Sequence, residues 1–150
     1  MDERSLAIAS NGKRLWSFAI DDMVINIFLM IIFSSQITAL MSGMTEVNEA
    51  SVALVNQFIF DNIAIVLAIK VLYHTLLIWQ SGMTLGKYIM KIKVVDFRTG
   101  GGLSFTQAFW RASVRLISEM FFYVGFLFAF FSPLHQTLHD KLSNAVVIDV

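Results

Sequence analysis

The chain lacks cysteine, contains a single proline and carries little charge. Without cysteine, disulfide bonds, thiolate catalysis and cysteine-ligated metal sites are excluded. Asp, Glu, Lys and Arg together make up 15% of the 150 residues, and 11 basic residues balance 11 acidic ones. The chain therefore lacks the basic footprint of a nucleic-acid-binding protein, and we expect no nucleic-acid partner.

Apolar residues are abundant instead. They make up 57% of the chain, against about 45–50% in soluble domains, and the mean hydropathy is +0.69. Three apolar segments predict helices at about residues 15–41, 52–79 and 105–134, long enough to cross about 30 Å of hydrocarbon. A soluble bundle is disfavoured because no polar face balances the apolar one. We predict one all-α integral membrane domain over residues 1–150, with the lipid bilayer as a partner.

Lys and Arg are unevenly distributed between these segments. Residues 42–61 contain none. The basic residues before the first helix and between the second and third are Arg4, Lys13, Arg14, Lys87, Lys91, Lys93, Arg98 and Arg111. Because Lys and Arg collect in cytoplasmic loops, the pattern predicts a cytoplasmic N-terminus and a cytoplasmic second loop.

The second loop is predicted to be structured. Residues 84–92 show an amphipathic pattern that predicts an interfacial helix, with Lys87 and Lys91 directed toward lipid phosphates. Runs of β-branched residues predict short strands at about 93–97 and 145–150, and a glycine-rich turn follows the first.

The predicted tail strand bears on the topology. A lone strand is unstable in water, so pairing of the two strands favours a small cytoplasmic β element and a cytoplasmic tail. The third apolar segment then enters and leaves on one side, as a re-entrant segment or a same-side helical hairpin broken near residues 119–122 or Gly125. A single pass, with the tail outside, stays the alternative.

Ionisable residues occur within the apolar segments, where they are costly and usually have a partner and a purpose. At 1.5 Å per residue, Asp21 lies about 10 Å into the first helix. On the second helix, Lys70 and His74 lie about 14 and 8 Å from the same interface. These depths predict one polar cluster, rimmed by Arg14 and Arg115. Its members are Asp21, Asp22, Lys70, His74 and Glu119.

Two interpretations of this cluster stay open. It can be an ion-pair network that holds the helices together, since polar contacts between membrane helices contribute about 0.6–2 kcal/mol each. It can also be a proton or cation site, because burial moves carboxylate, Lys and His groups toward titration near neutral pH. If His74 is neutral, the cluster contains three carboxylates and one cation, Lys70. This surplus of negative charge favours binding of a cation or a shared proton.

Other motifs predict no enzyme chemistry. His135 and His139 form an i, i+4 pair beside Asp140, but no further zinc ligand lies nearby in the sequence. Residues 82–87 superficially suggest a phosphate-binding loop, yet the glycine spacing is wrong and Tyr88 replaces the Ser or Thr that would bind magnesium. We expect no catalytic residue, cofactor or metal, and no enzyme activity.

Three motifs follow one another over residues 14–148. They are Arg14-Leu15-Trp16-Ser17-Phe18-Ala19-Ile20-Asp21, then Gly82-Met83-Thr84-Leu85-Gly86-Lys87 with Lys93-Val94-Val95-Asp96 and Arg111, and finally Ser132-Pro133 with Gln136-Thr137-Leu138-His139-Asp140-Lys141-Leu142. In this order they resemble the RDD family of small bacterial membrane proteins, named after one arginine and two aspartates. By this resemblance, the arginine and the two aspartates that give the family its name correspond to Arg14, Asp21 and Asp140 in this chain. Asp22 is then an extra carboxylate.

The resemblance implies a multi-pass protein of the bacterial inner membrane that transports an unidentified ligand, without enzyme activity or cofactor. With a cytoplasmic tail, Asp140 can pair with Arg14 or Arg111; the alternative is that Asp140 only caps a local turn. The residues expected to support the motifs and the cluster are Gly82, Thr84, Gly86, Lys87, Arg111 and Arg115.

The most concrete function predicted is cation- or proton-coupled exchange through an oligomer, because three helices alone rarely enclose a pathway. Asp21 is then the exchanging carboxylate, Asp22 and Glu119 assist it, and Lys70 and His74 tune it. The alternative is a non-transporting scaffold or regulatory subunit, whose cluster is structural and whose loop lysines contact a partner. The expected partners are a second copy of the chain or other membrane proteins, together with a small cation or proton.

Overall fold

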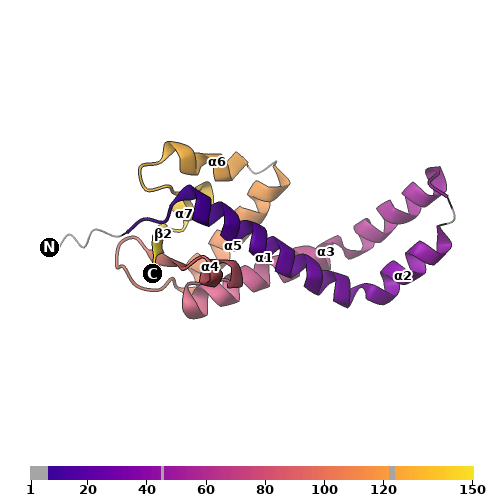
Figure 1. Ribbon diagram of the computed structural model, residues 1–150, viewed down its shortest axis with the longest axis horizontal. Coiled ribbons are helices and arrows are strands. Elements are labelled where there is room, and N and C mark those ends of the chain that lie inside the picture. Colours follow the sequence, from indigo (N-terminus) through magenta and orange to yellow (C-terminus); the bar gives the residue numbers. More distant parts are fainter. Residues whose placement is uncertain (1–6, 45, 122–123) are drawn as a thin grey trace.

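The computed structural model describes residues 7–44, 46–121 and 124–150. These residues form an elongated, mainly helical molecule with one small sheet (Figure 1). We call the end that holds the sheet the sheet end; the opposite end is made by α2 and the beginning of α3. The elements are α1 (Asn11–Ile32), α2 (Ser34–Gly43), α3 (Glu49–Ser81), α4 (Leu85–Ile89), β1 (Ile92–Asp96), α5 (Phe105–Met120), α6 (Val124–Phe131), α7 (Leu138–Leu142) and β2 (Ala145–Asp149).

The first apolar segment is divided into α1 and α2 at Phe33, where one continuous helix was predicted. The side chain of Ser10 caps the start of α1 by accepting a hydrogen bond from the Lys13 amide. The backbone of Phe33 is not helical. Ser34 and Ser35, which follow Phe33, form helices less readily than the apolar residues that precede it. The helix of about residues 15–41 is therefore two helices, of which α1 is the longer.

The second apolar segment is the single helix α3, 33 residues long. It begins before the predicted residue 52, because Asn48 and Ser51 form a reciprocal capping box. It ends at Gly82, whose φ of 73° is left-handed and whose Cα lies against the β1 backbone. Both α1 and α3 are long and apolar enough to cross a membrane, and few of their residues are buried.

The third apolar segment is bent rather than straight. Helices α5 and α6 meet at an angle of 107°, and α5 packs along α3. At Gly125 a Cβ would lie 2.1 Å from the Ser118 hydroxyl oxygen, so glycine lets α6 fold closely onto α5. One continuous helix over residues 105–134 is therefore wrong, and the bend agrees with the predicted same-side arrangement.

The two predicted strands pair, as expected. Strands β1 and β2 are antiparallel, with Val94 opposite Val147 at the centre. The segment before α1 adds to the sheet edge: the Ala9 amide donates to the Val147 carbonyl at 3.0 Å and the Asp149 amide to the Ala7 carbonyl at 2.7 Å. The tail strand thus lies beside the second loop and the N-terminal segment. The apolar core beneath it contains Ala9, Ile78, Ile92, Val94, Leu103, Ala108, Ala145 and Val147.

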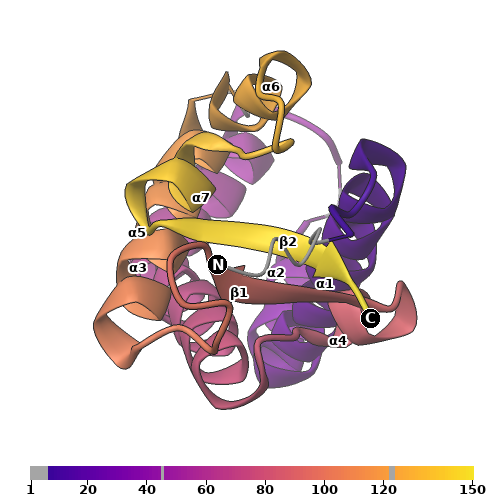
Figure 2. The same cartoon turned by 90° about the vertical axis from the view of Figure 1, so that its left-hand side faces the viewer.

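Two short helices flank the sheet (Figure 2). Helix α4 packs against α1, and α7 packs against α5. Helix α4 is shorter than the predicted 84–92, because Lys91 adopts a φ of 55° and the strand begins at Ile92. The orientation predicted for Lys87 is wrong: its side chain is buried against α1, whereas Lys91 is exposed.

Candidate functional site

Asp21 lies at the junction of α1, α3 and α4 and is fully buried. Its carboxylate accepts hydrogen bonds from the Tyr73 hydroxyl at 2.9 Å, the Thr84 hydroxyl at 2.5 Å and the Gly86 amide at 2.8 Å. Three neutral donors from two other elements therefore surround one buried charge. This is the arrangement that burial of a carboxylate requires, and it fixes α4 against the two long helices.

Gly86 makes this contact possible. A Cβ at this position would lie 2.1 Å from the Ser17 carbonyl oxygen and 3.0 Å from the Asp21 carboxyl carbon. Only a residue without a side chain lets the α4 backbone approach α1 so closely. The next residue, Lys87, is carried into the same interior, where its ammonium group donates to the Ser17 hydroxyl at 3.4 Å.

The environment of Lys87 disfavours its charge. Burial lowers the pKa of Lys87 to about 7, and the positive charge of Arg111 adds to this effect while Asp21 opposes it. A lysine that titrates near neutral pH is thus enclosed at the sheet end.

Asp22, the neighbour of Asp21, belongs to a different network. Lys70 on α3 bridges Asp22 at 3.2 Å and Glu119 on α5 at 2.9 Å. Their side chains are only partly covered: 33% of Asp22, 20% of Lys70 and 10% of Glu119 is exposed. Glu119 also accepts from Arg115 at 3.1 Å, one turn earlier on α5. We call this group of Asp22, Lys70, Glu119 and Arg115 the Lys70 network.

His74 joins the Lys70 network through Arg115, whose guanidinium lies 3.1 Å from His74 Nδ1. The predicted polar cluster is therefore present, but it has two parts. Successive residues point about 100° apart on a helix, so Asp21 faces α4 while Asp22 faces Lys70.

Asp140 forms the third carboxylate centre. It is fully buried on α7 and binds Arg111 through Nε at 2.8 Å and Nη2 at 2.7 Å, while Arg14 binds its second oxygen. Burial alone would raise the pKa of Asp140, but Arg111 and Arg14 hold it well below its usual value. The predicted pairing is confirmed with both arginines. The alternative, a local cap, is also present, because the Thr137 amide donates to Asp140 at 3.3 Å.

The charge balance differs from the predicted one. We count the charged groups around Asp21, the Lys70 network, Asp140 and Lys87, within residues 7–44, 46–121 and 124–150. They comprise five cations and four carboxylates, so one positive charge is in excess when all are ionised. The negative surplus expected from the sequence was counted over Asp21, Asp22 and Glu119 against Lys70 alone; folding adds the basic side chains of α1, α4 and α5 to this group. The cations are Arg14, Lys70, Lys87, Arg111 and Arg115, and the carboxylates are Asp21, Asp22, Glu119 and Asp140.

Two side chains that sequence reasoning missed are Tyr73 and Ser17. Tyr73 donates to Asp21, and Ser17 is fully buried beside Lys87. Ser17 lies four residues before Asp21, one helical turn, so this spacing could have placed it on the same face. Across the part of the chain that the structure describes, no group of three or more His, Asp or Glu side chains is placed to hold a metal ion.

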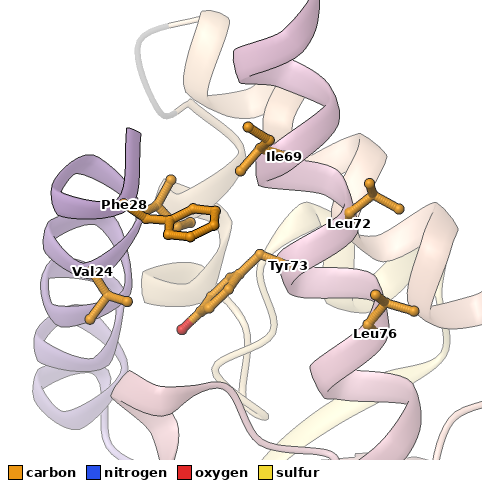
Figure 3. Close-up of a pocket in the computed structure, with 7 residues that line it drawn as sticks. Val24, Phe28, Ile69, Leu72, Tyr73 and Leu76 are labelled. Atoms are coloured by element: carbon orange, nitrogen blue, oxygen red, sulfur yellow. The ribbon is translucent and has the colours of Figure 1, made fainter. Parts of the chain in front are cut away.

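An apolar groove runs between α1 and α3 on the outside of these polar contacts (Figure 3). Its volume is about 380 Å³. The ring of Tyr73 reaches into the space between the two helices, so the groove lies directly beside the Asp21 site. The lining residues are Val24, Ile25, Phe28, Ile69, Leu72, Tyr73 and Leu76.

The model of the RDD family matches residues 8–144, which include all three carboxylate centres. This chain belongs to the RDD family. The name residues Arg14, Asp21 and Asp140 thus lie at two neighbouring buried sites, one of which joins Arg14 to Asp140 directly.

Curated relatives of this RDD protein come from mycobacteria. It is 33% identical over 69 residues to "Proline-rich antigen homolog" of Mycobacterium tuberculosis, in strains CDC 1551 / Oshkosh and ATCC 25618 / H37Rv. It is 30% identical over 70 residues to "Proline-rich antigen" of Mycobacterium leprae. The matches cover 46% and 47% of this chain but only 29% and 28% of the relatives' lengths. No solved structure matches.

Proposed function

We propose that this RDD protein exchanges a proton or small cation across a membrane through the Lys70 network. The observation that supports this best is the ion pair between Asp22 on α1 and Lys70 on α3. Both helices can span a membrane, and both side chains stay partly exposed. Asp21 and Asp140 are fully buried and bind several donors. Asp22 and Glu119 share the ammonium group of Lys70, each with one further donor, Asn26 for Asp22 and Arg115 for Glu119, and they stay partly exposed.

Exchange at this network follows from the shared lysine. When a proton or cation binds Asp22, Lys70 can pair fully with Glu119; when it leaves, Lys70 bridges both again. Each state keeps the charges paired, which limits the cost of carrying them in a low-dielectric environment. Asp21, which the sequence suggested as the exchanging group, then serves to hold α4 in place. No cofactor or covalent step is needed.

The membrane context is part of the proposal. The basic residues of the sheet end and their absence from residues 42–61 support a cytoplasmic sheet end in the bacterial inner membrane. Two or three spans leave large apolar faces exposed, for example at Phe28 and Leu72, and so few helices rarely enclose a pathway by themselves. We therefore propose that a homo-oligomer, or a complex with another membrane protein, completes the route.

The test is ion flux in proteoliposomes that contain a pH-sensitive dye and face imposed sodium, potassium or lithium gradients. The wild type is expected to give a cation-dependent pH change that Asp22→Asn and Glu119→Gln abolish. Asp61→Asn is the matched control, since Asp61 also lies on a long apolar helix but is exposed and contacts only Gln57 among the contacts described. Wild-type vesicles that behave like empty ones, with the protein folded, contradict the proposal.

A second candidate function is a membrane scaffold or regulatory subunit. The observation that favours it is the saturation of Asp21 and Asp140 by hydrogen bonds and ion pairs, as in a purely structural core. A scaffold predicts that Asp22→Asn lowers folding or complex assembly without any flux to lose. Crosslinking in native membranes, compared between wild type and this variant, separates the two functions.

A further inference from the structure

A small cavity lies at the sheet end, between α1, α4, α5 and α7, and almost all of its polar lining consists of hydrogen-bond donors. None of the carboxylates in the described part of the chain lines it. Such a surface is complementary to an anion and not to a cation. Its polar lining residues are Arg14, Lys87, Arg111, Arg115, Thr137 and His139.

Lys87 gives the strongest indication that the cavity holds an anion. Its side chain is only 6% exposed, yet its one described hydrogen bond is the 3.4 Å contact with Ser17. The other buried cations of the cavity have carboxylate partners: Asp140 binds Arg14 and Arg111, and Glu119 binds Arg115. Among the described residues, Lys87 is within ion-pair distance of no carboxylate. This lysine is therefore the cation of the cavity that has no direct carboxylate partner, although the charge of Asp21 acts on it from a greater distance.

His139 supplies an independent observation. It lines the same cavity, is 3% exposed, and its Nδ1 atom has no hydrogen-bond partner in the described structure. Burial lowers the pKa of His139 well below its usual value, with Arg111 adding to the effect and Asp140 opposing it, so the ring is neutral. Because Nε2 lies 3.9 Å from an Asp140 oxygen, Nδ1 is the ring nitrogen without a partner, and a proton placed on Nδ1 is a buried donor that lacks an acceptor.

The size of the cavity limits the anion. About 30 Å³ is open to the centres of water molecules, where one water needs about 10–15 Å³. This is room for one ion slightly larger than water, and not for a phosphate ester or a carboxylic acid of any length. We propose that the RDD protein binds a single chloride ion here, held by Lys87, His139 and the arginines of α1 and α5.

This site shares only Arg115 with the Lys70 network, and the proposal does not rest on the exchange of a proton or cation. The chloride balances the excess charge of the sheet end and joins α4 to α7, two elements that reach the cavity from opposite sides of the sheet end. Its expected effect is therefore on stability, and it does not require that the protein transports anything. Loss of flux without loss of chloride binding, or the reverse, distinguishes the two proposals.

The experiment measures thermal unfolding of the purified protein in detergent, in sodium chloride, sodium bromide or sodium gluconate of equal ionic strength. Chloride and bromide are expected to raise Tm by about 3 °C at a tenfold excess over Kd, in a saturable manner, relative to gluconate, which is too large for the cavity. Equal Tm values in chloride and gluconate overturn the proposal, because water or the neutral form of Lys87 then suffices.

The line width of the chloride NMR signal measures chloride binding directly. The wild type is expected to broaden this signal, and added bromide should restore the narrow line by competition whereas gluconate should not. Lys87→Gln is expected to lose the broadening, and Lys141→Gln, a change at an exposed lysine, is the control. Broadening that bromide does not reverse, or that Lys87→Gln retains, contradicts the assignment. The competition needs only wild-type protein, so it stays decisive even where the variant does not fold.

Discussion

Arg14 and Asp140 are 126 residues apart in the chain and form a buried ion pair that Arg111 completes. The pair joins the beginning of α1 to α7, just before the tail strand β2. The two name residues at the ends of the RDD pattern are thus one contact in space. It closes the sheet end, because the segment before α1 and the tail strand meet in the same sheet.

Removal of this carboxylate should be severe. Asp140→Asn leaves two buried arginines without their shared counter-charge, and breaking a buried pair by removing one partner costs about 3–5 kcal/mol. Chemical unfolding in detergent measures the loss. Asp149→Asn is the control, since its ion pair with Lys13 is more than a third exposed to solvent and exposed pairs contribute at most about 1 kcal/mol. Equal losses in the two variants would show that burial of Asp140 is not what matters.

The close approach of α4 to α1 gives a second prediction. Gly86→Ala places a methyl group 2.1 Å from the Ser17 carbonyl oxygen, so the helices must separate. We expect a loss of about 1–3 kcal/mol, as in overpacked cores. Gly12→Ala adds the same group where nothing lies within 4 Å, and the better helix former should leave stability unchanged or raise it. The free energies of unfolding of both variants check this, and a tolerated Gly86→Ala would refute the tight contact.

Tyr73 tests the hydrogen bonds of Asp21. Tyr73→Phe removes one of three donors to a buried carboxylate at constant ring size. A loss of about 1.5–3 kcal/mol is expected, because the bond is to a charged group. Tyr88→Phe removes the hydroxyl of a tyrosine that is 70% exposed and should change little. Unfolding curves that are the same for both variants would show that Thr84 and Gly86 alone hold Asp21.

Lys87 predicts how stability depends on pH. Its pKa is lowered to about 7 in the folded protein, from 10.5. Between these values the unfolded chain keeps a proton that the folded protein has released, so stability rises with pH, by up to about 1.4 kcal/mol per unit. Burial is the main cause of this lowered pKa; Arg111, Arg115 and Arg14 lower it further, and Asp21 opposes them.

The measurement is chemical unfolding from pH 7 to 9 in sodium gluconate, so that halide does not stabilise the charged lysine. The free energy of unfolding of the wild type should increase over this range, and Lys87→Met should lose most of the slope. Lys141→Met keeps the buried lysine and should keep the slope. If Lys87→Met and the wild type rise in parallel, the titrating group lies elsewhere.

The sequence by itself determined the elements whose signals are local. Apolar length predicted α1 and α3, because a helix needs a fixed number of residues to cross hydrocarbon. Runs of β-branched residues located β1 and β2, and the instability of a lone strand made their pairing the expected outcome. The family resemblance, combined with a cytoplasmic tail, also offered the pairing of Asp140 with Arg14 or Arg111, with a local cap as the alternative.

Only the tertiary structure decided which charges share a site. Depth along a helix follows from counting residues, but the direction of a side chain depends on how the helix is rotated against its neighbours. That rotation separates Asp21 from Asp22, and the absence of a side chain at Gly86 carries Lys87 from the expected surface into the interior. The charge balance of the larger group has the same origin: it depends on which elements pack together, because packing adds Arg14, Lys87 and Arg111 to the neighbourhood of the cluster, and no local pattern in the sequence records that.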